Sequence, residues 1–227
     1  WESLSRKGYA WDYLHEQIIQ RAEVGNGILR CGEMSFRVFI AAGAESLQAD
    51  TAAVLERFVE CGGRLLFLDS VPSRDPTMEG TDWGAADVGV RLTHLLDRFP
   101  ERVVCAPFPG SGVDGDREMA SLLERLGIAP LVQLDSADEE VYATVRTHGE
   151  SRLFLLINHS RERTIAVRAT CAGRPDPAQR WDPHTGVRTP LPRDKSGRWS
   201  VELPPLESAL IVADPSFDES APAAVAR

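Results

Sequence analysis

The sequence predicts an α/β region followed by an all-β region, and two observations carry this prediction. Residues 36–72 read as strand, helix and strand, which is the βαβ unit of a parallel sheet. From about residue 135 the pattern changes to short strands separated by turn residues. We therefore expect an α/β domain over residues 1–135, an antiparallel β-sandwich over 136–214 and a disordered tail over 215–227.

The first segment predicts a helix, a turn and a short strand. Apolar residues recur at helical spacing over residues 12–22, and Asp12 suits the N-cap because its carboxylate can accept a backbone N–H. Gly25-Asn26-Gly27 is typical of a turn. Ile28–Cys31 then predicts a strand that ends at Gly32.

The βαβ unit organises the first half of the chain. Phe36–Ala42 and Leu65–Leu68 are continuous apolar runs, which is typical of parallel strands covered on both faces. Between them, Val54, Leu55, Phe58 and Val59 recur at helical spacing. Gly62 and Gly63 follow, where glycine readily takes the left-handed conformation that ends a helix.

The rest of the first half continues as loops, helices and strands. We expect a helix at Val88–Phe99, a strand at Arg102–Ala106, a helix at Arg117–Leu126 and a strand at Leu131–Leu134 that closes the domain. The polar stretch 71–87 is a long loop after a parallel strand. Because ligands of open α/β sheets bind outside the carboxyl ends of the strands, this loop is a candidate binding or interface segment, or else a plain surface excursion.

The pattern of the second half predicts about seven strands. In the first of them, Val141, Ala143 and Val145 alternate with more polar residues, which predicts one buried face. The turn 183–186 joins two of the strands as a hairpin. The expected strands are Val141–Thr147, Arg152–Asn158, Thr164–Thr170, Gln179–Asp182, Val187–Leu191, Trp199–Leu203 and Ser208–Val212.

Composition excludes several classes of function. The net charge of −9 and scattered basic residues argue against a nucleic-acid partner, which requires a basic face. No apolar run approaches the roughly 20 residues of a membrane helix, and no signal peptide opens the chain, so we expect a soluble protein and leave open whether its parent is cytoplasmic or secreted. A chain that opens on Trp1 reads as a fragment or a processed product.

No motif for catalysis, a cofactor or a metal is complete. Ser70 follows a strand but lacks the flanking glycines of a nucleophile elbow. Gly110-Ser111-Gly112 precedes a helix and could hold an anion, although a flexible loop is the simpler interpretation. The four cysteines form no CxxC pair, the five histidines are isolated, and Asp12, His15 and Glu16 read as a solvated helical face. We therefore expect no cofactor, no metal site and no catalytic residue in this chain.

Several residue runs, taken in order, resemble a segment of large glycoside hydrolases. In the first half they are Trp11-Asp12-Tyr13, Asn26-Gly27-Ile28-Leu29, Phe36-Arg37-Val38-Phe39, Phe58–Gly63 and Pro72. In the second half they are Phe154–Ser160, Trp181–Gly186 and Leu203–Ala209. The chain is similar in these runs to α-L-rhamnosidase-like enzymes and to the middle and C-terminal domains of family 42 β-galactosidases. The resemblance covers residues 9–213, and the order of the motifs carries it.

The resemblance implies a fold for this chain and places catalysis in another domain of the same polypeptide. Residues 9–135 would form a flavodoxin-like, class I glutamine amidotransferase-like domain without its nucleophilic cysteine, and a β-sandwich would follow. The catalytic carboxylates would lie in an upstream (β/α)8 barrel of the same polypeptide, because such a barrel takes about 250 residues. Asp12 and Glu33 would line the edge of that neighbouring site and contact the carbohydrate substrate, and a homo-oligomer contact is compatible with this role.

Three functional hypotheses follow. The first is a non-catalytic C-terminal region of a glycoside hydrolase that braces the barrel or completes its rim. The second is a carbohydrate-binding or protein-interaction module, in which Trp181 and Trp199 stack on sugars, although packing in a hairpin or core is the simpler role for both rings. The third is an independent hydrolase that acts through the loop 71–87, which no catalytic motif supports. An apolar patch on the first domain would favour the first hypothesis.

Overall fold

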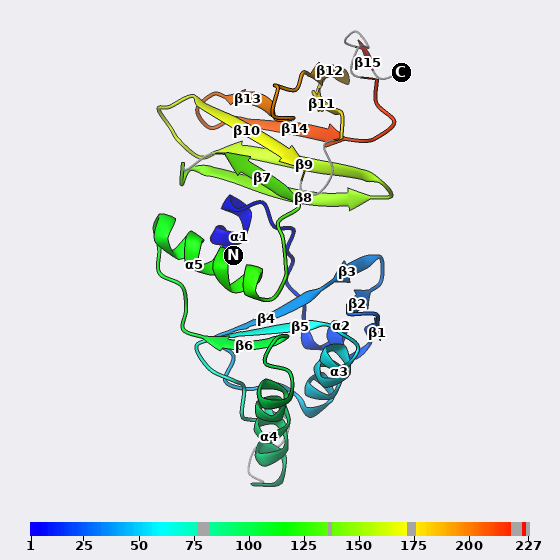
Figure 1. The fold of residues 1–227 in the computed structure, drawn as a ribbon, viewed down its shortest axis with the longest axis vertical. Helices are drawn as coiled ribbons and strands as arrows, with labels where there is room; N and C mark the ends of the chain where they lie inside the picture. The colour runs from blue at the N-terminus through cyan, green and yellow to red at the C-terminus, as the bar shows by residue number, and fades with distance from the viewer. Residues whose placement is uncertain (77–81, 136–137, 172–175, 219–223, 226–227) are drawn as a thin grey trace. The chain divides into compact units, whose positions relative to one another are not determined.

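The computed structural model describes residues 1–76, 82–135, 138–171, 176–218 and 224–225. These residues form helices together with one parallel and several antiparallel sheets (Figure 1). The chain divides into two compact units. The parallel-sheet unit contains residues 12–109 and 121–128, and the sandwich unit contains residues 1–11, 110–120 and 129–227.

The βαβ prediction is confirmed in the parallel-sheet unit. Strands β4 (Val38–Ala42), β5 (Arg64–Leu68) and β6 (Val103–Ala106) pair in parallel in that order. Helix α3 (Ala49–Glu60) connects β4 to β5. The helix ends as its glycines predict, because Gly62 has a φ of 99° and the N–H groups of Gly62 and Gly63 donate to the carbonyls of Val59 and Phe58.

Both faces of the central strand β5 are buried, as its unbroken apolar run predicts. Leu65 and Phe67 point to one face and Leu66 and Leu68 to the other, and all four are at most 3% exposed. The first pair packs in a core with α3 and with α4 (Asp82–Arg98). Helix α4 begins before the predicted Val88, so the expected loop 71–87 is helical from Asp82, and residues 77–81 lie outside the described residues.

The first helix of the parallel-sheet unit is shorter than predicted. Helix α2 spans Glu16–Gln20, and its N-cap is His15, whose Nδ1 accepts the N–H of Gln17 at 3.3 Å. The Asp12 carboxylate instead accepts the adjacent N–H of Tyr13 at 2.9 Å. The prediction of a helix capped by Asp12 was wrong because apolar periodicity locates a helical face but not the residue at which the helix begins.

Three short strands form a separate antiparallel sheet, of which the sequence predicted only the middle one. They are β1 (Glu23–Gly25), β2 (Ile28–Cys31) and β3 (Met34–Phe36). The β1–β2 loop consists of Asn26 and Gly27 with φ values of 51° and 71°, as a type I′ hairpin turn requires. The predicted turn is therefore confirmed, and it also fixes the register of the hairpin.

The sandwich unit contains two antiparallel sheets around one core. One sheet has the order β15-β12-β11-β14-β9-β8 and the other β13-β10-β7. Phe154 and Trp199, one from each sheet, pack with ring centroids 5.8 Å apart. The strands are β8 (Val141–His148), β9 (Ser151–Asn158), β10 (Ile165–Cys171), β11 (Ala178–Trp181), β12 (Val187–Leu191), β13 (Trp199–Leu203) and β14 (Ser208–Ala213). The seven predicted strands are therefore present, and Val141, Ala143 and Val145 form the buried face of β8.

Segments remote in sequence complete the sandwich unit. Strand β7 (Val132–Asp135), expected to close the first domain, pairs with β10, since the apolar pattern of a strand does not name its partner. The carbonyl of Gly8 accepts the N–H groups of Leu131 and Val132, which ties the segment after α1 (Glu2–Arg6) to β7. Helix α5 (Gly112–Arg125) contributes residues to both units, and the boundary along the chain falls between residues 120 and 121.

The tail expected to be disordered contributes β15 (Ala224–Val225), which pairs with β12. The remainder of that prediction falls partly on residues 219–223 and 226–227, outside the described residues. Over the part of the chain that the structure describes, no helix combines the length and apolarity needed to cross a membrane.

Candidate functional site

The segments that follow Asp12 and precede Glu33 in the sequence line one pocket in the parallel-sheet unit. The pocket has a volume of about 370 Å³ and lies between α2 and the β2–β3 turn. Asp12 precedes this lining by three residues and Glu33 follows it directly, and both are exposed. The lining residues are His15, Gln17, Ile18, Arg21, Cys31 and Gly32.

The polar groups around this pocket serve local structure rather than catalysis. His15 caps α2, and a carboxylate oxygen of Glu16 accepts the N–H of Gln48 at 2.8 Å. Burial raises the pKa of the Cys31 thiol, which therefore stays protonated and is a poor nucleophile. The lining contributes no carboxylate from the described residues, so the pocket lacks the two acids that glycoside hydrolysis uses.

Exposed apolar side chains occur in the two segments that line the same pocket. Ile18 lines it, while Tyr13 and Met34 lie two residues before and after lining residues, and all three are exposed. We call Tyr13, Ile18 and Met34 the α2–β3 face. Neighbouring exposed apolar side chains are typical of surfaces that contact another protein or domain.

The two loops that resembled incomplete catalytic motifs have simple structures. Ser70 is exposed, and the chain continues from it into Val71 and Pro72 rather than into a helix, so no nucleophile elbow forms. At the start of α5, a Glu118 carboxylate oxygen accepts the N–H of Gly110 at 2.9 Å, and one from Glu139 accepts the N–H of Val113 at 3.1 Å. These carboxylates occupy donors that a bound anion would use.

The rings of the two candidate sugar-stacking tryptophans pack against other side chains of the sandwich unit. Trp199 is 1% exposed and lies in the sandwich core, so its ring cannot contact a ligand. The guanidinium of Arg188 lies 4.2 Å from the ring centre of Trp181. The simpler interpretation, packing in a core and in a hairpin, is confirmed for Trp199 and describes Trp181 as well.

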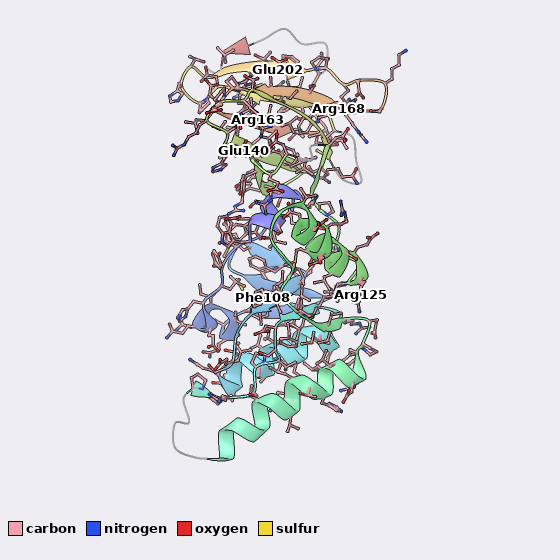
Figure 2. All side chains as sticks on the ribbon, turned by 90° about the vertical axis from the view of Figure 1, so that its left-hand side faces the viewer. Phe108, Arg125, Glu140, Arg163, Arg168 and Glu202 are labelled. Atoms are coloured by element: carbon pink, nitrogen blue, oxygen red, sulfur yellow. The ribbon has the colours of Figure 1, made fainter. Side chains whose placement is uncertain are left out.

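A second pocket, of about 500 Å³, lies in the sandwich unit and was not expected from the sequence. Arg163 and Glu140 line it, and Figure 2 labels both residues. Arg163 pairs with Asp138 at 2.9 Å and with Glu140 at 2.5 Å. Its other lining residues are His159, Ser160, Arg161 and Glu162. Because its central arginine is already neutralised, the pocket offers no unpaired charge from that side chain to a ligand. Among the described residues, no group of three His, Cys, Asp or Glu is placed to hold a metal ion.

Solved structures, but no sequence matches, are similar to this chain. No protein-family model matches the sequence, and no curated protein is similar to it at the sequence level. A rhamnosidase from Novosphingobium sp. PP1Y is similar in structure, with a TM-score of 0.66 and 18% identity over 97% of this chain. A β-galactosidase from Bacillus circulans sp. alkalophilus has a TM-score of 0.52 and 12% identity over 93% of this chain. The GH42 β-galactosidase Gan42B from G. stearothermophilus is more distant, with a TM-score of 0.45 and 13% identity over 78% of this chain in its E323A form.

In each case this chain corresponds to only a fraction of the other protein. It spans 21% of the rhamnosidase chain, 36% of the Bacillus circulans β-galactosidase chain and 32% of the Gan42B chain. The matches to the rhamnosidase and to the Bacillus circulans β-galactosidase confirm, at the level of the fold, the resemblance that the sequence motifs predict. The fold is that of a part of such glycoside hydrolase chains.

Proposed function

We propose that this chain is a non-catalytic accessory region of a longer glycoside hydrolase. The observation that carries the proposal is the fold match over 97% of this chain to 21% of a rhamnosidase. In the proposal, the parallel-sheet unit is a class I glutamine amidotransferase-like, flavodoxin-like module, and the β-sandwich is the C-terminal module that follows it. The parent cleaves O-glycosidic bonds with two carboxylates on an upstream (β/α)8 barrel.

The cysteines support a role without amidotransferase chemistry. Cys31 is buried with a raised pKa, Cys61 follows α3, and Cys105 lies within β6. An amidotransferase nucleophile requires a strained turn from a strand into a helix, and none of these three positions is such a turn. This unit therefore lacks the nucleophile of an amidotransferase, as a structural module would.

The α2–β3 face is the surface that we assign to the barrel. Tyr13, Ile18 and Met34 expose apolar side chains there, and burial against a second domain would remove them from water. Asp12 and Glu33 are exposed and lie close in sequence to residues that line the pocket, and in the proposal they reach the rim of the neighbouring active site and contact the carbohydrate. A homo-oligomer that covers the same face is the competing arrangement.

The first test compares the intact mass and N-terminal sequence of the natural protein with its reading frame. We expect a barrel-sized segment in the same polypeptide, and hydrolysis of aryl rhamnosides or aryl galactosides by that whole protein but not by the 227-residue chain. Hydrolysis by the 227-residue chain itself would show that the region is catalytic and would overturn the proposal.

A second test addresses the assigned surface. Ile18→Asp in the whole protein places a charge on the α2–β3 face and should lower its thermal midpoint and its activity together. Val90→Asp is the matched control, since Val90 is an exposed apolar residue of α4 outside that face. Equal effects of the two substitutions would contradict the assignment, and a change of oligomeric state alone would favour the homo-oligomer.

A further inference from the structure

An exposed aromatic ring spans the carboxyl end of the parallel sheet. Phe108 follows β6 and is 53% exposed (Figure 2). A Cβ atom on Gly43, which follows β4, would lie 3.4 Å from Cζ of the Phe108 ring. Because β5 lies between β4 and β6, the ring reaches across the end of the central strand.

Asp69 lies at the end of that central strand in an unfavourable backbone conformation. Its N–H donates to the carbonyl of Ala106 at 2.8 Å, and its φ is 83°, in the left-handed region that favours glycine. Its carboxylate is exposed and has no hydrogen bond or ion pair with any residue that the structure describes. A residue that violates a local conformational preference without a compensating contact is expected where its side chain has a function.

We propose that Phe108 and Asp69 form a binding site for a neutral saccharide at the carboxyl edge of the β4-β5-β6 sheet. The apolar face of a pyranose stacks on an exposed aromatic ring, and a carboxylate accepts hydrogen bonds from sugar hydroxyls. Ser70, exposed and adjacent to Asp69, adds a hydroxyl that can donate or accept. The carboxyl edge is also where open α/β sheets bind their ligands.

The charge of the site narrows the class of ligand. The Asp69 carboxylate repels anions, whereas an aromatic ring beside a carboxylate also suits an organic cation. The choice of a saccharide over a cation rests on the proposed function. The site does not depend on the α2–β3 face, because no residue is shared between the two.

The test is a titration of the ¹⁵N-labelled 227-residue chain with L-rhamnose, D-galactose and disaccharides that contain them, monitored by NMR. We expect saturable shifts at millimolar concentrations, centred on residues 43, 69, 70 and 108. Phe108→Ala and Asp69→Gly should each weaken binding about tenfold. Val90→Ala is the control, since Val90 is an exposed apolar residue of α4, and it should leave binding unchanged.

Asp69→Gly also separates function from folding. Glycine fits the left-handed conformation, so this variant should raise the thermal midpoint by about 2 °C while it binds the saccharide about tenfold more weakly. Unchanged binding in Asp69→Gly and Phe108→Ala would overturn the proposal, as would shifts centred elsewhere or saturable binding of tetramethylammonium alone. Failure of the barrel assignment would leave these titrations unaffected, so the two proposals fail separately.

Discussion

Arg6 and Arg163 each contact two carboxylates in the sandwich unit, but the two clusters differ in burial. Arg6 binds Asp116 through two bonds, from Nε at 2.7 Å and from Nη2 at 2.8 Å, and the two side chains are 11% and 5% exposed. Arg163 also binds two carboxylates, yet its side chain is 59% exposed. The same residue types with similar distances therefore occupy very different dielectric environments.

The difference teaches that the number of ion pairs does not measure their importance for stability. An exposed ion pair adds little to the free energy of unfolding, because water competes for both charges. A charge left without a partner in a buried site lowers that free energy, because its desolvation is not offset by any contact. The Arg6 cluster also includes the hydroxyl of Tyr142, which accepts from Nη1 at 2.9 Å. It therefore links α1, α5 and β8, three segments far apart in sequence.

Removal of Arg6 should have the largest effect. Arg6→Met leaves the buried Asp116 carboxylate without its main partner, and we expect a loss of about 3 kcal/mol in the free energy of unfolding of the sandwich unit. Urea unfolding monitored by tryptophan fluorescence measures this loss, since Trp199 lies in the core of that unit. A loss under about 1 kcal/mol would mean that water reaches Asp116, and it would contradict the claim that the Arg6 pair matters more for stability than the exposed Arg163 pairs.

Removal of Asn158 should have the next largest effect. Its Nδ2 lies 2.8 Å from the carbonyl of Arg163, 2.9 Å from that of Leu203 and 3.0 Å from that of Pro204, and its Oδ1 accepts the N–H of Ser160 at 2.8 Å. Asn158→Ala leaves these buried groups unpaired, so we expect a loss of about 2 kcal/mol by urea unfolding.

Arg161→Ala is the control for Asn158→Ala, because Arg161 lies three residues further along the chain and is exposed. If Arg163→Met costs as much as Asn158→Ala, the side chain of Arg163, rather than its buried backbone carbonyl, would be the important contact.

Acid should weaken the Arg6 cluster selectively. Burial alone would raise the pKa of Asp116, but hydrogen bonds from Arg6 and Ser3 and the charge of Arg6 outweigh burial and lower the pKa below its usual value. A lowered folded-state pKa contributes stability above the unfolded-state pKa of about 3.9, and this stability is lost as pH falls through the folded value.

The stability difference between wild type and Asp116→Asn should therefore narrow below about pH 4, as measured by urea unfolding at several pH values. Hydrogen bonds within their turns also lower the pKa of Asp182 and of Asp194, but these groups are the same in both proteins and cancel in the difference. A difference that is constant with pH would show that folding does not shift the pKa of Asp116 and would contradict the prediction.

Removal of the Arg163 side chain should have the smallest effect. We expect Arg163→Met to cost under about 1 kcal/mol, because its pairs with Asp138 and Glu140 are exposed. High salt should abolish this small cost while leaving most of the Arg6→Met effect in place. Urea unfolding of both variants at low and high salt makes the comparison directly.

The sequence predicted the parts of the fold that local pattern specifies. The apolar run of β5 predicts a strand that is buried on both faces, and the alternation along β8 predicts its one buried face. The run of β4 predicts the strand but not its burial, because only Ala41 in it is fully buried. The glycines after α3 predict where that helix ends. The Asn26-Gly27 turn predicts its hairpin because few residues accept two positive φ values in succession.

The sequence could not predict features that depend on distant partners. Nothing local in β7 indicates that it pairs with β10, and nothing in α1 indicates that Arg6 will meet Asp116, which lies 110 residues away. The candidate site shows the same limit. The pocket between α2 and the β2–β3 turn requires that hairpin to approach α2, and the position of Asp69 and Phe108 at one edge of the sheet requires the strand order β4-β5-β6.

The division of α1 from the rest of the sandwich unit has a consequence for protein synthesis. Among these 227 residues, 1–11 are synthesised before the rest of the sandwich unit, which comes from residues 110–120 and from 129 onward. At a synthesis rate of about 5–20 residues per second, Asp116 is added roughly 5 to 20 seconds after Arg6, and Tyr142 somewhat later. During that interval the parallel-sheet unit is nearly complete, whereas α1 remains without its partners in the nascent chain. A chaperone that binds α1 during this interval would thus delay the folding of the sandwich unit.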